Sequence, residues 1–198
     1  MAMHPDPLLI DVPTRLDTPR LVLRCPQPGD GAAYHEAIVA SQDELRRWMP
    51  WAHEPSSEPK YEAYARRAQA EFLSRCDLAM AIFLRQPDGG EGPLIGASGL
   101  HRMDWAVRSF EIGYWCHTGY GGQGYISEAV HAITTMAFET LAARRVEIRM
   151  DNRNERSRKL AERCGFELEG VLRCDCLDAN FELRDTRVYS RVRRDPVL

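Results

Sequence analysis

The sequence predicts a single α/β domain in which one mixed sheet carries helices on both faces. Segments that suit strands alternate with segments of helical periodicity along the whole chain. The chain has 198 residues, with 44% hydrophobic and 28% charged residues, which is enough for one well-buried core. No repeat, low-complexity tract or interdomain linker divides it, so one domain is expected.

The first third of the chain predicts a strand and three helices. An apolar run ends at Pro26, Asp30 can N-cap the helix that follows, and Pro59 suits the first turn of a long helix. The three prolines among residues 1 to 15 indicate a flexible N-terminal arm, which leaves residues 16 to 198 as the domain. The predicted elements here are a strand over residues 20–24 and helices over residues 30–39, 41–49 and 59–76.

The rest of the chain predicts further strands around one apolar helix. Residues 78–84 are almost entirely apolar, as in a central strand, and a turn at residues 87–90 leads to the next strand. Gly165 lies where a helix that begins at Glu155 would need its C′ residue. The predicted strands cover residues 78–84, 94–100, 109–116, 145–150, 167–173 and 186–193, and the predicted helices cover residues 125–141 and 155–164.

The bulk properties exclude several classes of function. A net charge of −3 gives no overall electrostatic reason to expect nucleic acid as a partner. The N-terminus lacks the basic region and apolar run of a signal peptide, and no apolar segment approaches the roughly 20 residues of a membrane span, so we expect a cytoplasmic protein without a membrane partner. Six scattered cysteines indicate free thiols, and because Cys174 and Cys176 have no second ligand pair, no metal site is expected.

The stretch 114–141 predicts a strand, a glycine-rich turn and a helix, and it carries the strongest functional signal. Four glycines fall within six positions, at Gly119, Gly121, Gly122 and Gly124. Glycine lets backbone N–H groups approach a ligand closely. The N-terminus of the helix that follows would direct unsatisfied N–H groups and the positive end of its dipole into the turn. The stretch therefore predicts a site for a phosphate-bearing ligand.

The same glycines match the dinucleotide fingerprint G-x-G-x-x-G, with Asp151 closing the next strand. Asp151 lies 27 positions beyond Gly124, whereas the ribose-binding acid usually follows after about 20. The turn also comes after more than half of the chain, which leaves few residues for further parallel units. An NAD-binding oxidoreductase is therefore a remote alternative, and a Walker A loop is excluded because no Lys-Ser/Thr pair follows the glycines.

A series of further motifs occurs in order over about residues 16 to 192. They are Thr18-Pro-Arg-Leu-Val-Leu-Arg24, Trp48-Met-Pro-Trp51, Glu111-Ile-Gly-Tyr-Trp115, Tyr120-Gly-Gly-Gln-Gly-Tyr-Ile-Ser-Glu-Ala129, Asn154-x-x-Ser157, Cys164-Gly-Phe166 and Glu169-Gly-Val-Leu-Arg173. Together they resemble the GCN5-related N-acetyltransferase (GNAT) superfamily, and more narrowly its ribosomal-protein N-terminal (alanine/serine) acetyltransferase-like branch. The resemblance implies a mostly antiparallel sheet of six to seven strands, splayed after the fourth strand. It also implies direct transfer of an acetyl group from acetyl-CoA to a primary amine.

The resemblance implies where the coenzyme binds. Main-chain groups of Trp115 and Cys116 would hold the pantetheine arm, and Asn154 would contact the coenzyme. The family's pyrophosphate signature is Arg/Gln-x-x-Gly-x-Gly/Ala, and this chain departs from it at Gly121 and Ile126. Binding would then depend on backbone N–H groups rather than on those side chains. The turn residues implied in coenzyme binding are Gly121, Gly122, Gln123, Gly124, Tyr125, Ile126 and Ser127.

The resemblance also implies two catalytic residues. Glu111 shares a face of the fourth strand with Gly113 and Trp115, where many relatives carry a carboxylate base that acts directly or through water. An ion pair at the sheet edge is the alternative role of Glu111. Ser157 matches the position whose hydroxyl protonates the leaving thiolate, and its alternative is a local hydrogen bond in the first turn of its helix.

Several other residues are candidates with equally ordinary alternatives. Trp48 and Trp51 would wall the acceptor site or pack in the core. His101 and His117 are conceivable bases, although a lone histidine is more often a surface or hydrogen-bonded residue. Cys116 suggests an acyl-cysteine mechanism, but the sequence shows no basic partner for it.

The acceptor is the least determined part of the function. The branch resemblance indicates the N-terminal α-amine of a protein. A small amine, such as a polyamine, an aminoglycoside or an amino-acid-like amine, is the alternative within the enzyme class. A noncatalytic acyl-CoA-binding module is the alternative from another class, and a homodimer is compatible with the branch.

Overall fold

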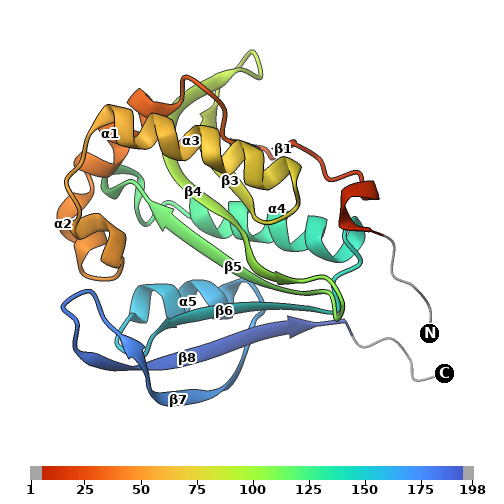
Figure 1. Cartoon of the computed structure of the whole chain (residues 1–198), viewed down its shortest axis with the longest axis vertical. Coiled ribbons are helices and arrows are strands. Elements are labelled where there is room, and N and C mark those ends of the chain that lie inside the picture. The colour runs from red at the N-terminus through yellow and green to blue at the C-terminus, as the bar shows by residue number, and fades with distance from the viewer. Residues whose placement is uncertain (1–5, 194–198) are drawn as a thin grey trace.

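The computed structural model describes residues 6–193 of the chain. Within them, eight strands form one sheet in the order β1-β2-β3-β4-β5-β6-β8-β7, with helices on both faces (Figure 1). The predicted fold class is confirmed. The strands are β1 (Arg15–Asp17), β2 (Leu21–Arg24), β3 (Leu78–Arg85), β4 (Glu91–Asp104), β5 (Ser109–Cys116), β6 (Arg145–Asp151), β7 (Glu167–Leu177) and β8 (Leu183–Val192).

The helices lie close to the segments expected from the sequence. They are α1 (Gly31–Val39), α2 (Gln42–Arg46), α3 (Glu58–Leu73), α4 (Tyr125–Glu139) and α5 (Glu155–Arg163), with short 3-10 turns η1 (Pro7–Leu9), η2 (Pro50–His53) and η3 (Thr118–Tyr120). Helix α4 buries Ile126, Ala129, Val130 and Ile133, a spacing that places them on one face. Among the helices of residues 6–193, the length and apolar character that a membrane crossing requires do not occur together.

The sheet has more strands than the six to seven expected. The additional strand is β1, which pairs antiparallel with β2 and lies at the edge of a proline-rich segment with little periodicity. Residues 1–5 of the predicted N-terminal arm lie outside the described residues. Within the described part of that arm, Val12 is buried in the core and Ile10 packs against it.

All neighbouring strands are antiparallel except β5 and β6. These two pair in parallel over three residues, Ser109–Glu111 against Arg145–Glu147, although both strands continue beyond them. Figure 1 shows β5 and β6 side by side at one end and diverging toward the other. The splay follows the strand at residues 109–116, the fourth strand of the sequence prediction, as expected.

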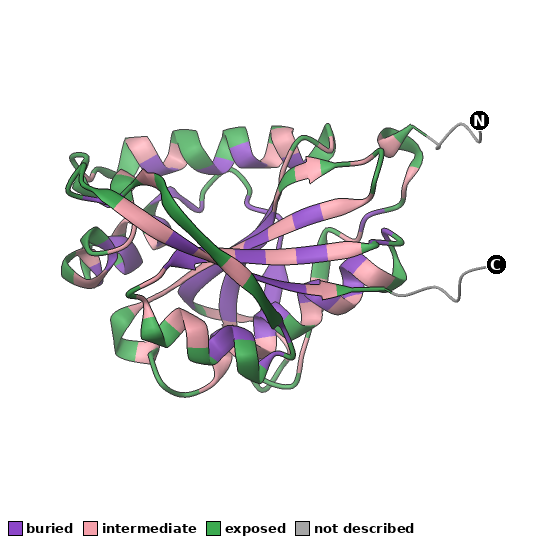
Figure 2. Ribbon diagram, turned by 90° about the horizontal axis from the view of Figure 1, so that it is seen from below, coloured by how far each residue is buried: buried purple, intermediate pink, exposed green. Residues whose placement is uncertain are grey.

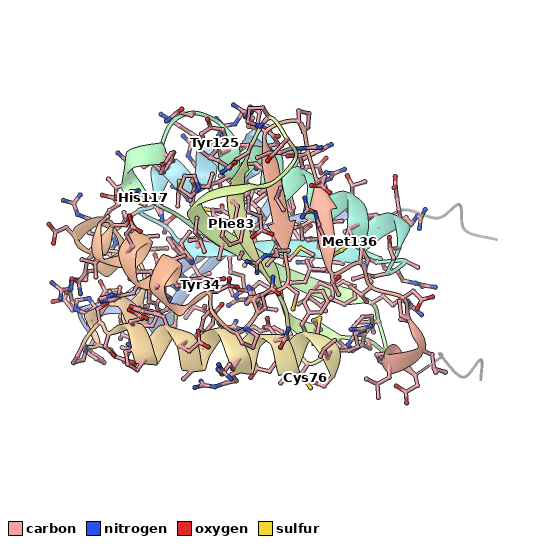
Figure 3. All side chains as sticks on the ribbon, turned by 90° about the horizontal axis from the view of Figure 1, so that it is seen from above. Tyr34, Cys76, Phe83, His117, Tyr125 and Met136 are labelled. Atoms are coloured by element: carbon pink, nitrogen blue, oxygen red, sulfur yellow. The ribbon has the colours of Figure 1, made fainter. Side chains whose placement is uncertain are left out.

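The two faces of the sheet have separate hydrophobic cores. In one core, side chains of α4 and α5, such as Leu160, pack with Ile112 of the sheet. In the other core, side chains of α1 and α3, such as Tyr34, pack with Phe83 of the sheet. Figure 3 shows Tyr34 by the orange and yellow helices, Phe83 on the sheet, and Met136 on the helix at the opposite face. Each fully buried large side chain stabilises the fold by about 1.5–3 kcal/mol. Figure 2 shows the buried residues concentrated in the central strands, with exposed residues on the outer faces of the helices.

Candidate active site

The glycine turn adopts a conformation that requires glycine at two positions. Gly122 has φ +78° and Gly124 has φ +81°, in the left-handed region that costs other residues about 1–2 kcal/mol. Gly121 has φ −64°, which any residue adopts. Within the described chain, the backbone N–H groups of residues 122–127 have no hydrogen-bond acceptor. These N–H groups lie at the N-terminus of α4 and so form a site suited to a phosphate or diphosphate.

Side chains from outside the turn hold it in place. Arg20 donates from Nη1 to the carbonyl of Gln123 at 3.0 Å, and its guanidinium lies 4.5 Å from the centre of the Tyr125 ring. Arg20 also pairs with Glu128 in the first turn of α4 at 2.6 Å. At the other end of the turn, the Gly119 N–H donates to His117 Nδ1 at 2.9 Å. His117 and Tyr125 are labelled in Figure 3 and come from the two ends of the turn.

The side chain of Ile126, one of the two departures from the pyrophosphate signature, does not crowd the start of α4. It is 7% exposed and belongs to the core beneath the helix. Gly96 on β4 leaves space for it, since a Cβ added there would lie 3.3 Å from Ile126 Cδ1. The bulky residue therefore points away from the exposed N–H groups of the turn.

The polar side chains of Ser127 and Asn154 already have partners within the protein. Ser127 Oγ accepts from Arg163 Nε at 3.0 Å and from Nη2 at 2.8 Å. Asn154 Oδ1 accepts from the Ser157 N–H at 3.0 Å, which makes Asn154 the N-cap of α5. The contact of Asn154 with the coenzyme stays a prediction, and its amide Nδ2 is the group left to make it.

Tyr114 and Ser157 form a hydroxyl pair across the splay. Their oxygens are 2.7 Å apart and join β5 to the first turn of α5. Ser157 Oγ therefore does not make the local helix-turn hydrogen bond that was its alternative. Burial raises the pKa of Tyr114 to about 12, so its hydroxyl keeps its proton at neutral pH. Sequence reasoning missed Tyr114, although strand alternation places it on the face opposite Glu111.

Glu111 lies where the splay begins, because it is the last residue of β5 that pairs with β6. Its Cα partners are His101 on β4 and Glu147 on β6. Its side chain is 18% exposed, and Oε2 lies 3.3 Å from Nη1 of Arg102, an ion pair without hydrogen-bond geometry. Burial is the main cause that raises the pKa of Glu111 above its usual value. The ion pair expected as an alternative is present, at the position expected for a base.

The structure separates the two tryptophans that were expected to wall one site. Trp51 contacts Trp115, with ring centres 6.5 Å apart, on the face of β5 that carries Glu111. Trp48 instead lines a small cavity of about 20 Å³ beside Asp178, in the segment between β7 and β8. Trp51 is thus the tryptophan that the structure brings next to Trp115 on β5.

The thiol of Cys116 is unsuited to nucleophilic attack. Burial raises its pKa to about 11, and Sγ lies 3.3 Å from the carbonyl of His117. A thiol with this pKa is protonated at neutral pH, whereas the thiolate is the nucleophile. All six cysteines are free, and residues 6–193 contain no group of three or more His, Cys, Asp or Glu side chains that could hold a metal ion.

Comparisons with known proteins identify the family. A family model for the acetyltransferase (GNAT) domain matches residues 20–167. YdaF of Bacillus subtilis (strain 168), provisionally named a ribosomal N-acetyltransferase, is 33% identical over 179 residues, which cover 88% of this chain and 92% of the relative. The ribosomal-protein-serine acetyltransferase of Escherichia coli (strain K12) is 33% identical over 103 residues, 52% of this chain and 56% of that protein.

A solved structure has the same fold. RimL, the ribosomal L7/L12 alpha-N-protein acetyltransferase in complex with coenzyme A, matches with a TM-score of 0.77 at 20% identity. The match covers 91% of this chain and 97% of that chain. The family model spans well over half of the chain, and this result excludes the dinucleotide-binding alternative. The chain belongs to the GNAT acetyltransferase family, and it is an N-acetyltransferase that uses acetyl-CoA.

Proposed function

We propose that this protein acetylates the N-terminal α-amine of a protein by direct transfer from acetyl-CoA. The names of the Bacillus and Escherichia relatives, which refer to ribosomal acetyltransferases, support a protein acceptor. The observation that carries the proposal is the splay between β5 and β6, which begins directly after Glu111. A thioester placed in the splay is open to Tyr114 and Ser157 on one face and to Glu111 and Trp115 on the other.

The glycine turn fits the diphosphate of acetyl-CoA. Its unpartnered N–H groups at residues 122–127 can donate to phosphate oxygens, and Gly122 and Gly124 leave the approach free of side chains. In this proposal, the main chain at Trp115 and Cys116 orients the pantetheine arm along the unpaired edge of β5. These groups bind through backbone atoms, so the departure at Gly121 does not remove them.

The reaction needs two proton transfers, and residues on opposite faces of β5 carry them out. Glu111 promotes loss of the proton from the acceptor ammonium, directly or through an intervening group. The amine nitrogen then attacks the carbonyl carbon of the thioester, the C–N bond forms and the C–S bond breaks. The hydroxyl pair of Ser157 and Tyr114 gives the leaving sulfur its proton. The protonated thiol of Cys116 fits direct transfer rather than a covalent acyl-enzyme.

Release of the coenzyme A thiol with a panel of acceptors tests this function. The panel contains peptides that begin with serine or alanine, the same peptides with a formylated N-terminus, a polyamine and an aminoglycoside. We expect acceptor-dependent thiol release with the free peptides, and one acetyl group on the peptide N-terminus by mass spectrometry. Turnover with the polyamine or the aminoglycoside, but with no peptide, would contradict the proposed acceptor.

A further inference from the structure

A second titratable side chain lies beside Glu111 on the face where the acceptor would bind. His101 on β4 is the Cα partner of Glu111 on β5, so both side chains project from the same face of the sheet. His101 Nδ1 lies 2.6 Å from Oδ2 of Asp77, in the link between α3 and β3. A carboxylate on one ring nitrogen fixes the orientation of an imidazole and leaves the other nitrogen free to exchange a proton.

The ring of His101 lies against Gly113 of β5, with its free nitrogen Nε2 on that side. A Cβ added at Gly113 would lie 3.0 Å from His101 Cδ2 and 3.2 Å from Nε2, so the ring lies over Gly113 and requires a glycine there. Within residues 6–193, Nε2 makes no hydrogen bond to another side chain or backbone group. The side chain is 35% exposed, which gives a proton a route to solvent.

The spacing along β5 favours His101 over Glu111 as the group that contacts the amine. Trp115 lies four positions after Glu111 along the strand, a distance of about 13 Å at about 3.3 Å per residue. A general base must come within hydrogen-bond reach of the proton that it removes, or reach it through one water. Gly113 lies halfway along this distance, and the His101 ring covers it.

We propose that His101, oriented by Asp77, is the base that takes the proton from the acceptor ammonium, and that Glu111 stabilises the imidazolium that forms. The inference rests on the proposed function, because it needs an amine acceptor on this face. Nδ1–H of the neutral ring donates to Asp77, and Nε2 accepts the ammonium proton, which frees the lone pair of the amine for attack. Asp77 and Glu111 then flank the positive ring, and its proton passes to solvent.

The charged groups around the ring favour this order of events. Asp77 comes from the α3–β3 link, Glu111 comes from β5, and Arg102 follows His101 on β4. The side chain of Arg102 is 72% exposed and pairs with Glu111 at 3.3 Å. Water therefore screens the positive charge of Arg102 more strongly than it screens the negative charges of Asp77 and Glu111. The carboxylates of Asp77 and Glu111 therefore lie next to the ring from two different elements.

His101→Ala and Asp77→Asn test the inference in steady-state kinetics. We expect His101→Ala to lower kcat for the amine about 100-fold with an unchanged KM for acetyl-CoA, and we expect added imidazole to restore part of the rate. Asp77→Asn should lower kcat about tenfold. Gly113→Ala should lower kcat because it displaces the ring, whereas Gly170→Ala, where a Cβ meets nothing within 4 Å, should not.

The possible failures are distinguishable. Wild-type turnover with a small amine alone contradicts the proposed acceptor, and the variants are then assayed with that amine. Wild-type-like kcat in His101→Ala, or a loss that imidazole does not restore, overturns the role of His101. Proton NMR detects the hydrogen bond between His101 and Asp77 without any turnover. A downfield Nδ1–H signal should be present in the wild type and absent in His101→Ala and Asp77→Asn, and its absence from the wild type overturns the inference.

Discussion

The two faces of β5 are built from different kinds of groups. On the face toward α4 and α5, the neighbouring groups are backbone N–H groups, the neutral hydroxyls of Tyr114 and Ser157, and the protonated thiol of Cys116. On the opposite face, they include the charged Glu111, which is paired with Arg102, and the ring of Trp115. In the proposed complex acetyl-CoA contacts mainly backbone on the first face, so changes there should act through conformation. Changes on the second face should act through charge.

The largest expected effect is on the charged face. Glu111→Gln removes the carboxylate at the apex of the splay and keeps its shape. We expect kcat with the amine acceptor to fall about 100-fold, because the carboxylate promotes removal of the ammonium proton, either directly or by stabilising the imidazolium of His101, and a proton-transfer step contributes at least this much. The dissociation constant of acetyl-CoA, measured by calorimetry, should stay within about twofold. A similar loss in kcat and in affinity for acetyl-CoA would show that the two faces of β5 do not act independently.

A smaller effect is expected from a change of backbone conformation on the face of β5 toward α4 and α5, which we call the coenzyme face. Gly124→Ala forces a side chain into φ +81° at the start of α4, which costs about 1–2 kcal/mol. We expect acetyl-CoA affinity to fall about tenfold, with little change in kcat at saturation. Gly29→Ala is the matched control, because Gly29 has φ +100° and open space but lies far from the turn in sequence. It should lower the melting temperature and leave affinity unchanged.

Removal of one hydroxyl should have a more modest effect. Tyr114→Phe deletes the partner of Ser157 Oγ, a hydrogen bond of 2.7 Å. A hydrogen bond contributes about 0.5–1.5 kcal/mol net, so we expect kcat to fall about fivefold. Single-turnover kinetics would place this loss in the chemical step. An unchanged rate of that step would remove Tyr114 from the proposed proton delivery.

The stability of Glu111→Gln should depend on pH in a defined direction. Burial raises the pKa of Glu111 in the folded state, so the native protein binds more protons than the unfolded chain just above pH 4.5. Stability contributed by this group therefore falls as pH rises through the raised pKa. Glu111→Gln should melt slightly higher than the wild type at pH 7, and the difference should vanish near pH 4. A lower melting point at pH 7 would show that the pair with Arg102 outweighs the burial.

The smallest effect is expected at Cys116. Its buried thiol has a pKa of about 11, so direct transfer does not need it as a nucleophile. Cys116→Ala should retain kcat within about twofold, and mass spectrometry of the wild type with acetyl-CoA should detect no acetylated enzyme. A stable acetyl group on Cys116 would show that the coenzyme face takes part covalently.

Local sequence signals predicted the glycine turn and α4 better than the contacts around Glu111. The glycines and the apolar helix after them are contiguous, so the turn and α4 could be predicted from neighbouring residues. The pairing of His101 with Glu111 depends on the register of two strands, and a shift in that register follows His101 on β4. Trp48 and Trp51 are close in sequence, but the turn η2 sends them to different places. Contacts of this kind follow from tertiary packing, which spacing along the chain does not encode.

The short parallel ladder between β5 and β6 has a further consequence, which concerns unpaired sheet edges. Beyond Glu111 and Glu147, each strand presents unpaired backbone groups to the other, so the splay creates two sheet edges inside the molecule. Exposed edges at a sheet's perimeter invite pairing with other chains and hence aggregation. These internal edges lie next to α5, which contacts β6, and they offer a ligand with amide groups the same backbone pairing that a neighbouring strand would make.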